Sequence, residues 1–336
     1  MSGSKQSTKI NGGIAVIGTG SYVPEKKLTN LDLEKIVDTT DEWITTRTGI
    51  KERRIAAPGQ STSDLACEAA RKALKSAHLK ADEIDLIVVA TITPDVVFPA
   101  TACYVQHKLG AENAVAFDIS AACTGIVYAL SIVKNLMLGQ GYRNAIVIGA
   151  EVMSRSLNWS DRNTCVIFGD GAGAIVLQAG HPNRGLIYEY MGTNGSAADL
   201  IYIPAGGSRE PLTPQLLEEK KNCIYMDGKE VYKFAVRVMG ESIERALKDC
   251  EISADDVALM IPHQANIRII KASADKFGIP YEKVYVNIDR YGNTSGASIG
   301  IALDEAAKEG RIKRGDIIIL VAFGSGLTWG SSVIRW

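Results

Sequence analysis

Short apolar runs alternate along this chain with longer segments in which apolar residues recur every three or four positions. Residues 84–90, Ile-Asp-Leu-Ile-Val-Val-Ala, are a run of the first kind, which is typical of a strand covered on both faces. The segment before it, from Ala66 to Ala77, has its apolar residues on one helical face. Ser63 or Asp64 is placed to cap the start of that helix. Alternation of this kind predicts an α/β fold.

The same patterns predict the other elements of the first half. Strands are expected at 14–17, 114–118, 144–150 and 174–178, and a helix at 124–138. Gly18-Thr-Gly20 follows the first strand, but a dinucleotide-binding loop would need a third glycine where Val23 stands. We therefore expect a tight turn there. Further along, a proline- and glycine-rich loop at 204–214 precedes a helix predicted from about 229 to 249.

The second half of the chain repeats the first. Ala-Leu-Lys at 73–75 recurs at 246–248, and Ala-Asp-Glu-Ile at 81–84 is matched by Ala-Asp-Asp-Val at 254–257, both 173 residues later. Strand 84–90 then corresponds to 257–263, strand 114–118 to a strand at 284–287, and strand 144–150 to 316–322. Coincidence between two amphipathic helix–strand units is the alternative, but the constant separation favours duplication.

Duplication bears on where functional residues meet. Two matching halves imply a pseudo-twofold axis, and strand ends from both halves can come together beside it. We therefore divide the chain into a flexible leader at 1–11, an N-terminal half at 12–180 and a C-terminal half at 181–336.

Cys123 is the first of three candidates for chemistry. It stands in Ser-Ala-Ala-Cys-Thr-Gly, between strand 114–118 and helix 124–138. Unpaired N–H groups at a helix N-terminus favour the thiolate, so we expect the thiol pKa to be lowered. A buried structural cysteine is the alternative, and it is a good description of Cys67, Cys103, Cys165 and Cys250.

His263 and Asn293 are the other two candidates. His263 ends the predicted strand 257–263, and the carboxyl ends of strands are where α/β proteins gather their sites. Asn293 lies in Gly-Asn-Thr-Ser, 170 residues after Cys123, so we pair it with the Cys turn and infer a small deletion. A structural histidine and a turn-forming asparagine are the alternatives. A cysteine, a histidine and an amide donor together favour a site that handles thioesters.

Composition argues against several other classes of protein. The 336 residues are 46% hydrophobic and 22% charged with a net charge of −1, which gives no bulk field for nucleic acid or membranes. No CxxC or HxxxH pair occurs, so no metal site is expected. Gly296-Ala-Ser298-Ile-Gly300 matches the G-x-S-x-G hydrolase pattern, but no histidine follows Ser298, as that pattern requires.

The chain also carries signs of its compartment. Several cysteines lie in apolar runs, which suits reduced thiols in a cytoplasmic protein. The polar N-terminus has no apolar core of the kind found in signal peptides. No apolar run approaches the roughly 20 residues that span a bilayer. We therefore expect a cytoplasmic protein without membrane insertion.

Taken together, the motifs resemble those of the β-ketoacyl-acyl carrier protein synthase III family, the initiating condensing enzymes of bacterial type II fatty-acid synthesis. The likeness runs from about Ile14 to Trp336. It includes Gly18-Thr-Gly-Ser-Tyr-Val-Pro24, Thr40-Asp-Glu-Trp43-Ile, Arg47-Thr-Gly-Ile, Phe168-Gly-Asp-Gly-Ala-Gly173, Pro262-His-Gln-Ala-Asn266, Gly292-Asn-Thr-Ser295 and Phe323-Gly-Ser-Gly-Leu-Thr-Trp-Gly330. The resemblance implies the thiolase fold, a duplicated five-layer αβαβα arrangement, and a homodimer.

The resemblance also implies roles for individual residues. Cys123 matches the nucleophile, His263 and Asn293 match the pair that promotes decarboxylation, and the backbone N–H groups of Cys123 and Ser325 are expected to hold the oxyanion. Three groups of residues match binding positions: Trp43, Arg47 and Arg162 for the coenzyme A nucleotide; Gly228, Tyr232, Asn266 and Phe323 for the pantetheine tunnel and active-site lining; and Phe98, which reaches the partner subunit's acyl pocket.

The activity implied is a decarboxylative condensation. Cys123 takes the acyl group from an acyl-coenzyme A, malonyl-acyl carrier protein loses carbon dioxide, and the resulting enolate attacks the acyl-cysteine. Coenzyme A thioester is a substrate here, and neither a metal nor a bound redox cofactor is needed. A related condensing enzyme of polyketide-type biosynthesis and a non-catalytic coenzyme A-binding protein are the alternatives.

Local departures and surface charges complete the expectations. Ser325 and Leu327 stand where the family often has glycine and phenylalanine, and Tyr232 where phenylalanine is common. Cations on two predicted helices form a candidate basic rim for an acidic carrier protein: Lys233 and Arg237 on one helix, and Arg268 and Lys271 on the other. Ordinary solvated helix charges are the alternative.

Overall fold

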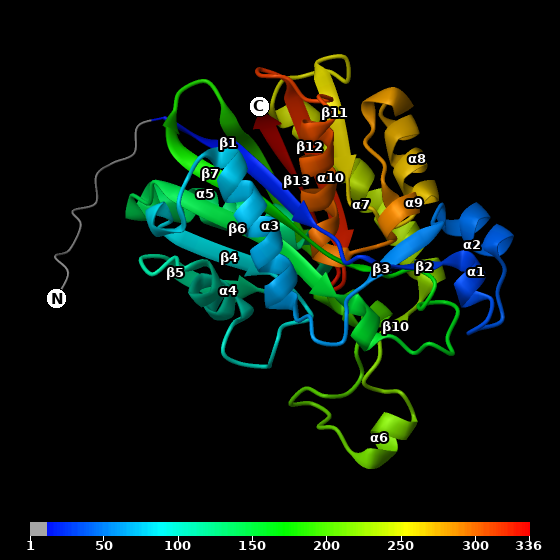
Figure 1. Cartoon of the computed structure of the whole chain (residues 1–336). Coiled ribbons are helices and arrows are strands. Elements are labelled where there is room, and N and C mark those ends of the chain that lie inside the picture. Colours follow the sequence, from blue (N-terminus) through cyan, green and yellow to red (C-terminus); the bar gives the residue numbers. More distant parts are fainter. Residues whose placement is uncertain (1–11) are drawn as a thin grey trace.

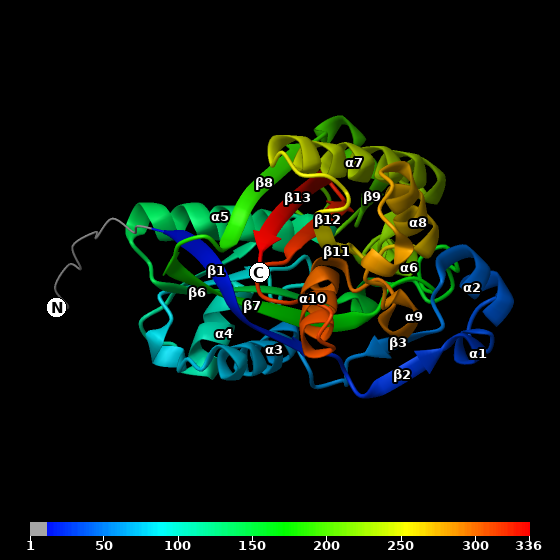
Figure 2. The same cartoon turned by 90° about the horizontal axis from the view of Figure 1, so that it is seen from above.

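Two β-sheets with helices on both faces form the body of the molecule (Figure 1). The computed structural model describes residues 12–336, so the leader predicted at 1–11 lies outside the described residues. Each sheet is built mainly from one half of the chain, and the two sheets face each other across a shared layer of helices (Figure 2).

The first sheet has the strand order β1-β7-β6-β4-β5. Its strands are β1 (Gly13–Tyr22), β4 (Leu86–Ala90), β5 (Val115–Ile119), β6 (Asn144–Val152) and β7 (Asp170–His181). β4 runs parallel to β5 and β6, whereas β7 runs antiparallel to β6 and β1. β4 and β6 are buried along their whole length, which explains their continuous apolar sequences.

The second sheet has the order β11-β12-β13-β8. Its strands are β8 (Gly185–Thr193), β11 (Val257–Pro262), β12 (Ile317–Gly324) and β13 (Thr328–Arg335). β11 and β12 are parallel, and the other pairs are antiparallel. The strand expected at 284–287 is wrong: a single bridge joins Met260 to Val284, and the chain then turns into α9 (Ile288–Tyr291).

The main helices form three layers around these sheets. α3 (Thr62–Ala77) and α4 (Thr101–Leu109) cover the outer face of the first sheet. α5 (Gly125–Gln140) and α10 (Ser298–Lys308) lie between the sheets, while α7 (Gly228–Asp249) covers the outer face of the second sheet and packs against α8 (Ile267–Lys276). This is the five-layer αβαβα arrangement that the resemblance implied.

The central layer holds the largest apolar core. Ile126 and Leu130 of α5 belong to one buried cluster with Val88 of the first sheet and Leu259 and Leu320 of the second. Contrary to expectation, the segment Ala122–Gln140 is long and apolar enough to cross a membrane by length and composition alone. Its packing against both sheets gives those apolar side chains partners within the protein.

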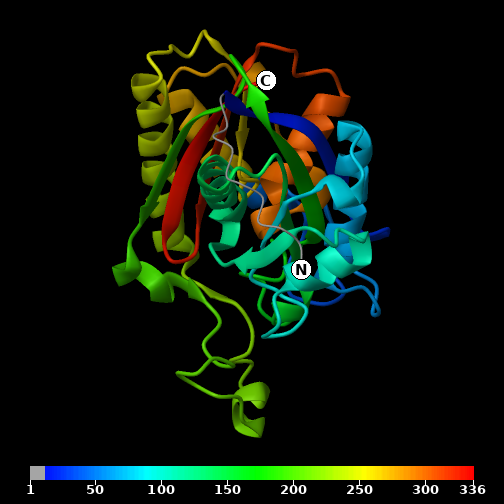
Figure 3. The same ribbon diagram turned by 90° about the vertical axis from the view of Figure 1, so that its left-hand side faces the viewer.

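Shorter helices, strands and turns lie around this body. They are two two-stranded antiparallel sheets, β2 (Lys26–Thr29) with β3 (Glu52–Ile55) and β9 (Ile201–Tyr202) with β10 (Tyr225–Met226); the helices α1 (Asn30–Leu33), α2 (Asp41–Thr48) and α6 (Pro214–Glu218); and 3₁₀ turns at Ala81–Glu83, Met153–Ser156, Gly195–Leu200 and Tyr281–Lys283. Figure 3 shows α6 on an arm that projects away from the sheets. The arm leaves the body after β9 and rejoins it at β10, and these two strands pair with each other.

The 173-residue separation extends to the turns between the sheets. η2 (Ala122–Thr124) leads into α5 as η6 (Ser295–Ala297) leads into α10. Their first residues both have positive φ, 46° at Ala122 and 48° at Ser295. Cys123 therefore corresponds to Gly296, and our pairing of Cys123 with Asn293 through a small deletion is wrong. Asn293 lies three residues before the position that matches the cysteine.

Gly18 and Gly20 lie within β1, so the tight turn expected there is also wrong. A Cβ atom at Gly20 would lie 2.3 Å from the carbonyl oxygen of Ala69, and one at Gly18 would lie 2.6 Å from that of Ala73. Both carbonyls belong to α3. The two glycines therefore allow the backbone of α3 to approach the strand closely.

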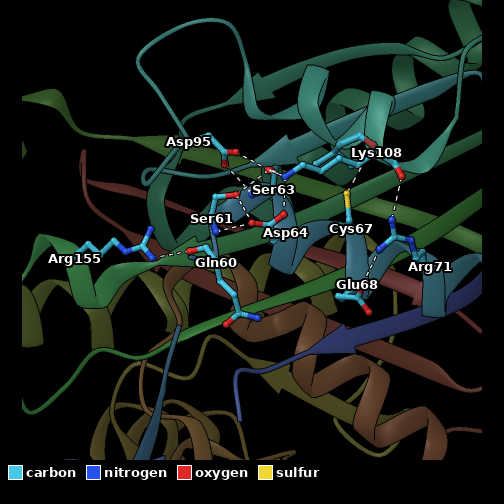
Figure 4. A network of polar contacts seen from close by, with 11 residues as sticks. Gln60, Ser61, Ser63, Asp64, Cys67, Glu68, Arg71, Asp95, Lys108 and Arg155 are labelled. Carbon is cyan, nitrogen blue, oxygen red and sulfur yellow. Dashed lines mark hydrogen bonds and ion pairs between the residues drawn. The ribbon is translucent and has the colours of Figure 1, made fainter. Parts of the chain in front are cut away.

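The N-cap of α3 is Ser61, and Asp64, one of the two predicted capping residues, completes a capping box with it, whereas Ser63 takes no part in the cap. Asp64 accepts hydrogen bonds from the Ser61 backbone N–H at 2.8 Å and from its hydroxyl at 2.7 Å. Ser63 instead bonds to Asp95, and Lys108 of α4 donates to both Ser63 and Asp64 (Figure 4). This network ties α3 and α4 to the start of the loop that follows β4.

Candidate active site

A cavity of about 470 Å³ opens where strand ends and turns of both halves meet. It is lined by the three candidate catalytic residues and by several of the residues assigned to binding. The predicted residues on its wall are Cys123, Gly228, Tyr232, His263, Asn266, Asn293, Phe323 and Ser325. Residues more than 100 positions apart in the sequence thus share one space.

Cys123 is held in the tight turn η2, at the start of the central helix α5. The preceding Ala122 has a positive φ, a conformation that is strained for any residue with a side chain. Gly324 allows the end of β12 to approach, since a Cβ there would lie 2.8 Å from the Cys123 nitrogen. The Cys123 sulfur lies 3.5 Å from the Ser295 hydroxyl of the matching turn.

The acid–base behaviour of this thiol differs from our expectation. Burial raises the pKa of Cys123 to about 12, although the hydrogen bond with Ser295 opposes that rise. The loss of water around the sulfur therefore outweighs the helix N-terminus on which the sequence argument relied. At neutral pH the resting side chain is a thiol, and its proton must leave when the sulfur attacks.

His263 directly follows β11 and is 1% exposed. Its Nδ1 lies 2.7 Å from the Ser298 hydroxyl. That hydroxyl oxygen also accepts the backbone N–H of Gln264 at 3.4 Å, so its own hydrogen is free to point at Nδ1. When this hydroxyl donates to Nδ1, the proton of the neutral ring lies on Nε2, which has no hydrogen-bond partner within residues 12–336.

The environment keeps this ring neutral. Burial lowers the pKa of His263 to about 3, so no imidazolium forms near neutral pH. The ring also packs edge-on against Phe323, with 5.7 Å between centroids. A neutral imidazole with a free Nε2–H is a hydrogen-bond donor suited to an oxygen that gains negative charge.

Asn293 offers a second donor on the same wall. Its backbone is fixed by a hydrogen bond to the Ile167 carbonyl at 2.9 Å and one from the Gly169 N–H at 3.0 Å. Its side-chain oxygen accepts the Ser295 N–H at 2.8 Å. The amide nitrogen is therefore the group left to donate into the cavity that Asn293 lines.

Ser325, the predicted oxyanion donor, directly follows β12 and lines the cavity. Its hydroxyl donates to the carbonyl of Ile201 in β9. This bond joins the loop after β12 to the strand pair β9–β10 at the base of the projecting arm. Leu327 is buried and does not line the cavity.

Trp43, Arg47 and Arg162 form a cluster outside the cavity wall. The guanidinium carbons lie 4.5 Å (Arg47) and 5.1 Å (Arg162) from the Trp43 ring centroid. The Asn266 amide, which lines the cavity, donates to the Arg47 carbonyl at 3.0 Å. The cluster therefore adjoins the cavity and presents two cations around one indole, which suits a nucleotide phosphate and base.

Phe98 does not line the cavity of its own chain. It is 84% exposed, and the neighbouring Val97 is 95% exposed. The loop that carries them is anchored at both ends, by Asp95 on Ser63 and by the backbone N–H groups of Thr101 and Ala102 on Asp118. An exposed apolar tip on a fixed base is a feature that a protein partner would cover.

The four basic rim residues are exposed, and each already has an intramolecular contact. Lys233 pairs with Glu230 at 2.7 Å and Arg237 with Glu241 at 3.1 Å on the same helix. Arg268 lies over the Tyr232 ring and Lys271 over the Tyr281 ring. Exposed ion pairs of this kind contribute little to stability, so the cations are available to a partner at small cost.

Three side chains that contact the candidate residues or their neighbours were missed by the sequence reasoning. Ser298 was considered only as a hydrolase nucleophile, yet it bonds to His263. Ser295 and the buried Glu151 were not singled out, although Ser295 touches Cys123 and Glu151 touches Ser295. The turn that repeats the Cys turn at a separation of 173 residues was the available signal for Ser295.

Known proteins are similar to this chain in both sequence and fold. The model of the 3-oxoacyl-[acyl-carrier-protein] synthase III family matches residues 117–195, and that of its C-terminal domain matches 247–336. The β-ketoacyl-[acyl-carrier-protein] synthase III of Caldanaerobacter subterraneus is 56% identical over 321 residues, 96% of this chain and 97% of that protein. The chain belongs to the β-ketoacyl-[acyl-carrier-protein] synthase III family.

Solved structures agree with this assignment. The 3-oxoacyl-[acyl-carrier-protein] synthase III of Aquifex aeolicus has 49% identity and a TM-score of 0.89, covering 96% of this chain and 100% of that one. A priming β-ketosynthase from the R1128 polyketide pathway has the same TM-score at 34% identity, covering 97% of each chain. As a member of the synthase III family, the chain has the thiolase fold and is an acyl-transferring condensing enzyme.

Proposed function

We propose that this enzyme condenses a short acyl-coenzyme A with malonyl-acyl carrier protein through an acyl-cysteine intermediate. The observation that carries the proposal is the shared cavity, in which a cysteine nucleophile faces two uncharged donors, His263 Nε2–H and the Asn293 amide. One nucleophile and two donors match the two half-reactions of such a condensation. The higher identity to synthase III enzymes than to the polyketide ketosynthase favours fatty-acid initiation.

In the first half-reaction, the Cys123 sulfur attacks the thioester carbon and coenzyme A leaves. The backbone N–H groups of Cys123 and Ser325 hold the oxyanion. The nucleotide rests on Trp43, Arg47 and Arg162, because a guanidinium pairs with phosphate and an indole stacks on a base.

In the second half-reaction, malonyl-acyl carrier protein enters along the wall formed by Gly228, Tyr232 and Asn266. His263 and Asn293 donate to its thioester oxygen as carbon dioxide leaves, and the enolate attacks the acyl-cysteine. Each such donor contributes roughly 100- to 1000-fold in rate. The chemistry needs neither a metal nor a redox cofactor, because the two donors stabilise the negative charge on the enolate.

The same proposal covers assembly and compartment. The exposed apolar tip at Val97 and Phe98 would be covered in a homodimer, where Phe98 would reach the partner's acyl pocket. Lys233, Arg237, Arg268 and Lys271 would dock the acidic carrier protein. All six cysteines are free thiols, which suits the reducing cytoplasm.

A product assay tests the reaction. Purified enzyme is supplied with malonyl-acyl carrier protein and each of a panel of acyl-coenzyme A thioesters, and the carrier protein is weighed by intact mass spectrometry. We expect 3-oxoacyl-carrier protein from at least one short acyl donor. Transfer to malonyl-coenzyme A but never to the carrier protein would favour a different condensing activity, and the absence of any acyl-enzyme would favour a coenzyme A-binding protein.

A further inference from the structure

A fully buried carboxylate lies one side chain away from the nucleophile. Glu151 stands near the end of β6 and is 0% exposed. Its Oε1 accepts a hydrogen bond from the Ser295 hydroxyl at 3.1 Å, and that hydroxyl lies 3.5 Å from the Cys123 sulfur. Ser295 is the side chain to which the Cys123 thiol donates in the described part of the chain. Sulfur, hydroxyl and carboxylate thus form a continuous hydrogen-bonded line.

The groups that bond to Glu151 in the described part of the chain are hydrogen-bond donors without a positive charge. Its Oε2 accepts from the Thr91 hydroxyl at 3.1 Å, the Ile92 N–H at 3.1 Å, the Thr93 N–H at 3.2 Å and the Thr93 hydroxyl at 2.6 Å. Between residues 12 and 336 it forms no ion pair or hydrogen bond with lysine, arginine or histidine. A buried carboxylate without a cation is costly, and this raises its affinity for a proton.

The charged and titratable groups around Glu151 are few. Three elements contribute the residues that face it. The loop after β4 contributes Thr91, Ile92 and Thr93, the neighbouring strand β7 contributes Gly171, and η6 contributes Ser295. None of these side chains titrates near neutral pH. Cys123 of η2 is the titratable group whose pKa responds to the charge of Glu151, while His263 is bonded to Ser298 instead.

We propose that Glu151 takes up, through the Ser295 hydroxyl, the proton that Cys123 loses on acylation, and returns it to the thiolate released by condensation. This inference rests on the proposed function. Glu151 acts through Ser295 and does not touch the substrate, so its role is to position and store a proton.

The proton balance closes over one turnover. On acylation, the Cys123 S–H proton passes to the Ser295 oxygen as the Ser295 hydrogen passes to Glu151. The bond from the Cys123 sulfur to the acyl carbon forms, the bond from that carbon to the coenzyme A sulfur breaks, and the released coenzyme A thiolate takes up a proton from solvent. On condensation, the enolate carbon bonds to the acyl carbon, the cysteine leaves as a thiolate, and protonated Glu151 restores its proton through Ser295.

The pKa values of the Cys123 thiol and the Glu151 carboxyl, at the two ends of this hydrogen-bonded line, suit the proton exchange. Burial raises the pKa of Cys123 to about 12, so the resting thiol needs an acceptor as it attacks. Burial also raises the pKa of Glu151 to about 7, against the hydrogen bonds from Thr93 and its neighbours. An acceptor whose pKa lies near the working pH is the most effective general base. Above about pH 7 Glu151 is a carboxylate and accepts the proton; below it, that capacity is lost.

Alkylation of Cys123 by iodoacetamide tests the relay without any acyl donor. The rate is followed from pH 5.5 to 9 by peptide mass spectrometry, for wild type, Glu151→Gln and Ser295→Ala. We expect the wild-type rate to show a step with a midpoint near pH 7. Both variants should lack that step, follow only the growth of the thiolate fraction with pH, and react at least tenfold more slowly at pH 8. Self-acylation by acetyl-coenzyme A should fall at least roughly 100-fold in both.

Two further variants separate a proton relay from a structural role. Asp170→Asn removes another carboxylate that is 0% exposed on the same sheet and bonds to Ser154, so it should leave the alkylation profile unchanged. Thr93→Val keeps the relay but removes one donor to Glu151, so it should move the midpoint to higher pH. This second variant decides the matter if Glu151→Gln fails to fold.

A Glu151→Gln or Thr93→Val profile identical to wild type overturns the relay, as does an equal change in Asp170→Asn. A Glu151-dependent profile together with a failure to transfer acetyl groups supports the relay and refutes the proposed function instead.

Discussion

The contact between Ser298 and His263 predicts how the two half-reactions separate. Ser298→Ala removes the hydroxyl that lies 2.7 Å from Nδ1, and with it the group that keeps the ring proton on Nε2. Asn293 and Cys123 keep their own contacts. We therefore expect the variant to decarboxylate malonyl-acyl carrier protein more slowly and to retain acylation of Cys123.

The size of this loss follows from the bond that is removed. A neutral hydrogen bond contributes about 0.5–1.5 kcal/mol net, which corresponds to roughly 2- to 13-fold in rate. Complete loss of the Nε2 donor would cost roughly 100- to 1000-fold. Because the ring remains and can still populate the same tautomer, we expect a reduction of about tenfold in decarboxylation, together with about 1–3 kcal/mol of lost stability from the unsatisfied buried Nδ1.

The assay follows conversion of malonyl-acyl carrier protein to acetyl-acyl carrier protein with no acyl-coenzyme A present, beside a separate measurement of Cys123 acetylation. Ser242→Ala is the matched control, since Ser242 is equally buried but donates to the Val238 carbonyl of its own helix at 2.7 Å. Unchanged decarboxylation in Ser298→Ala, or equal losses in both half-reactions, would refute the assignment of the Nε2 proton.

Three other predictions test the surroundings of the site. Arg47→Ala should raise the Michaelis constant for acyl-coenzyme A and leave acyl-pantetheine kinetics unchanged; equal losses with both substrates would place this arginine elsewhere. Reversal of Lys233 and Arg268 to glutamate should slow use of malonyl-acyl carrier protein, most at low salt, and spare self-acylation; unchanged kinetics at low ionic strength would rule out that docking surface. Gly149→Ala places a Cβ 2.1 Å from a carbonyl oxygen of the opposite half, so urea denaturation should show a loss of about 1–3 kcal/mol, whereas Gly139→Ala, with open space around it, should show none.

The sequence predicted those parts of the fold in which local pattern and burial agree. The apolar runs that form β4, β6 and β12 are buried on both faces, so their short length and their apolar composition both predicted a buried strand. The strand expected at 284–287 failed because only Val284 pairs with a neighbour, and the following residues form α9. Glycines 18 and 20 were misread because their cause, the approach of α3, is a tertiary contact.

The site was predicted in part for a similar reason. Cys123, His263 and Asn293 each follow a strand or a strand-like segment, and the duplication indicated that their positions converge. The raised pKa of Cys123 could not be foreseen, because it depends on the burial of the sulfur rather than on the adjoining helix. Glu151 escaped notice because its partners come from the segment 91–93 and from Ser295, far from it in the sequence.

Acylation and discharge of Cys123 test the central claim most directly. The enzyme is incubated with acetyl-coenzyme A, freed of excess donor and digested, and the mass of the peptide that contains Cys123 is measured before and after addition of malonyl-acyl carrier protein. We predict one acetyl group on Cys123, absent in Cys123→Ser, that disappears as 3-oxobutyryl-carrier protein forms in equal amount. An acetyl group that never forms on Cys123, or one that persists while product accumulates, would contradict the account.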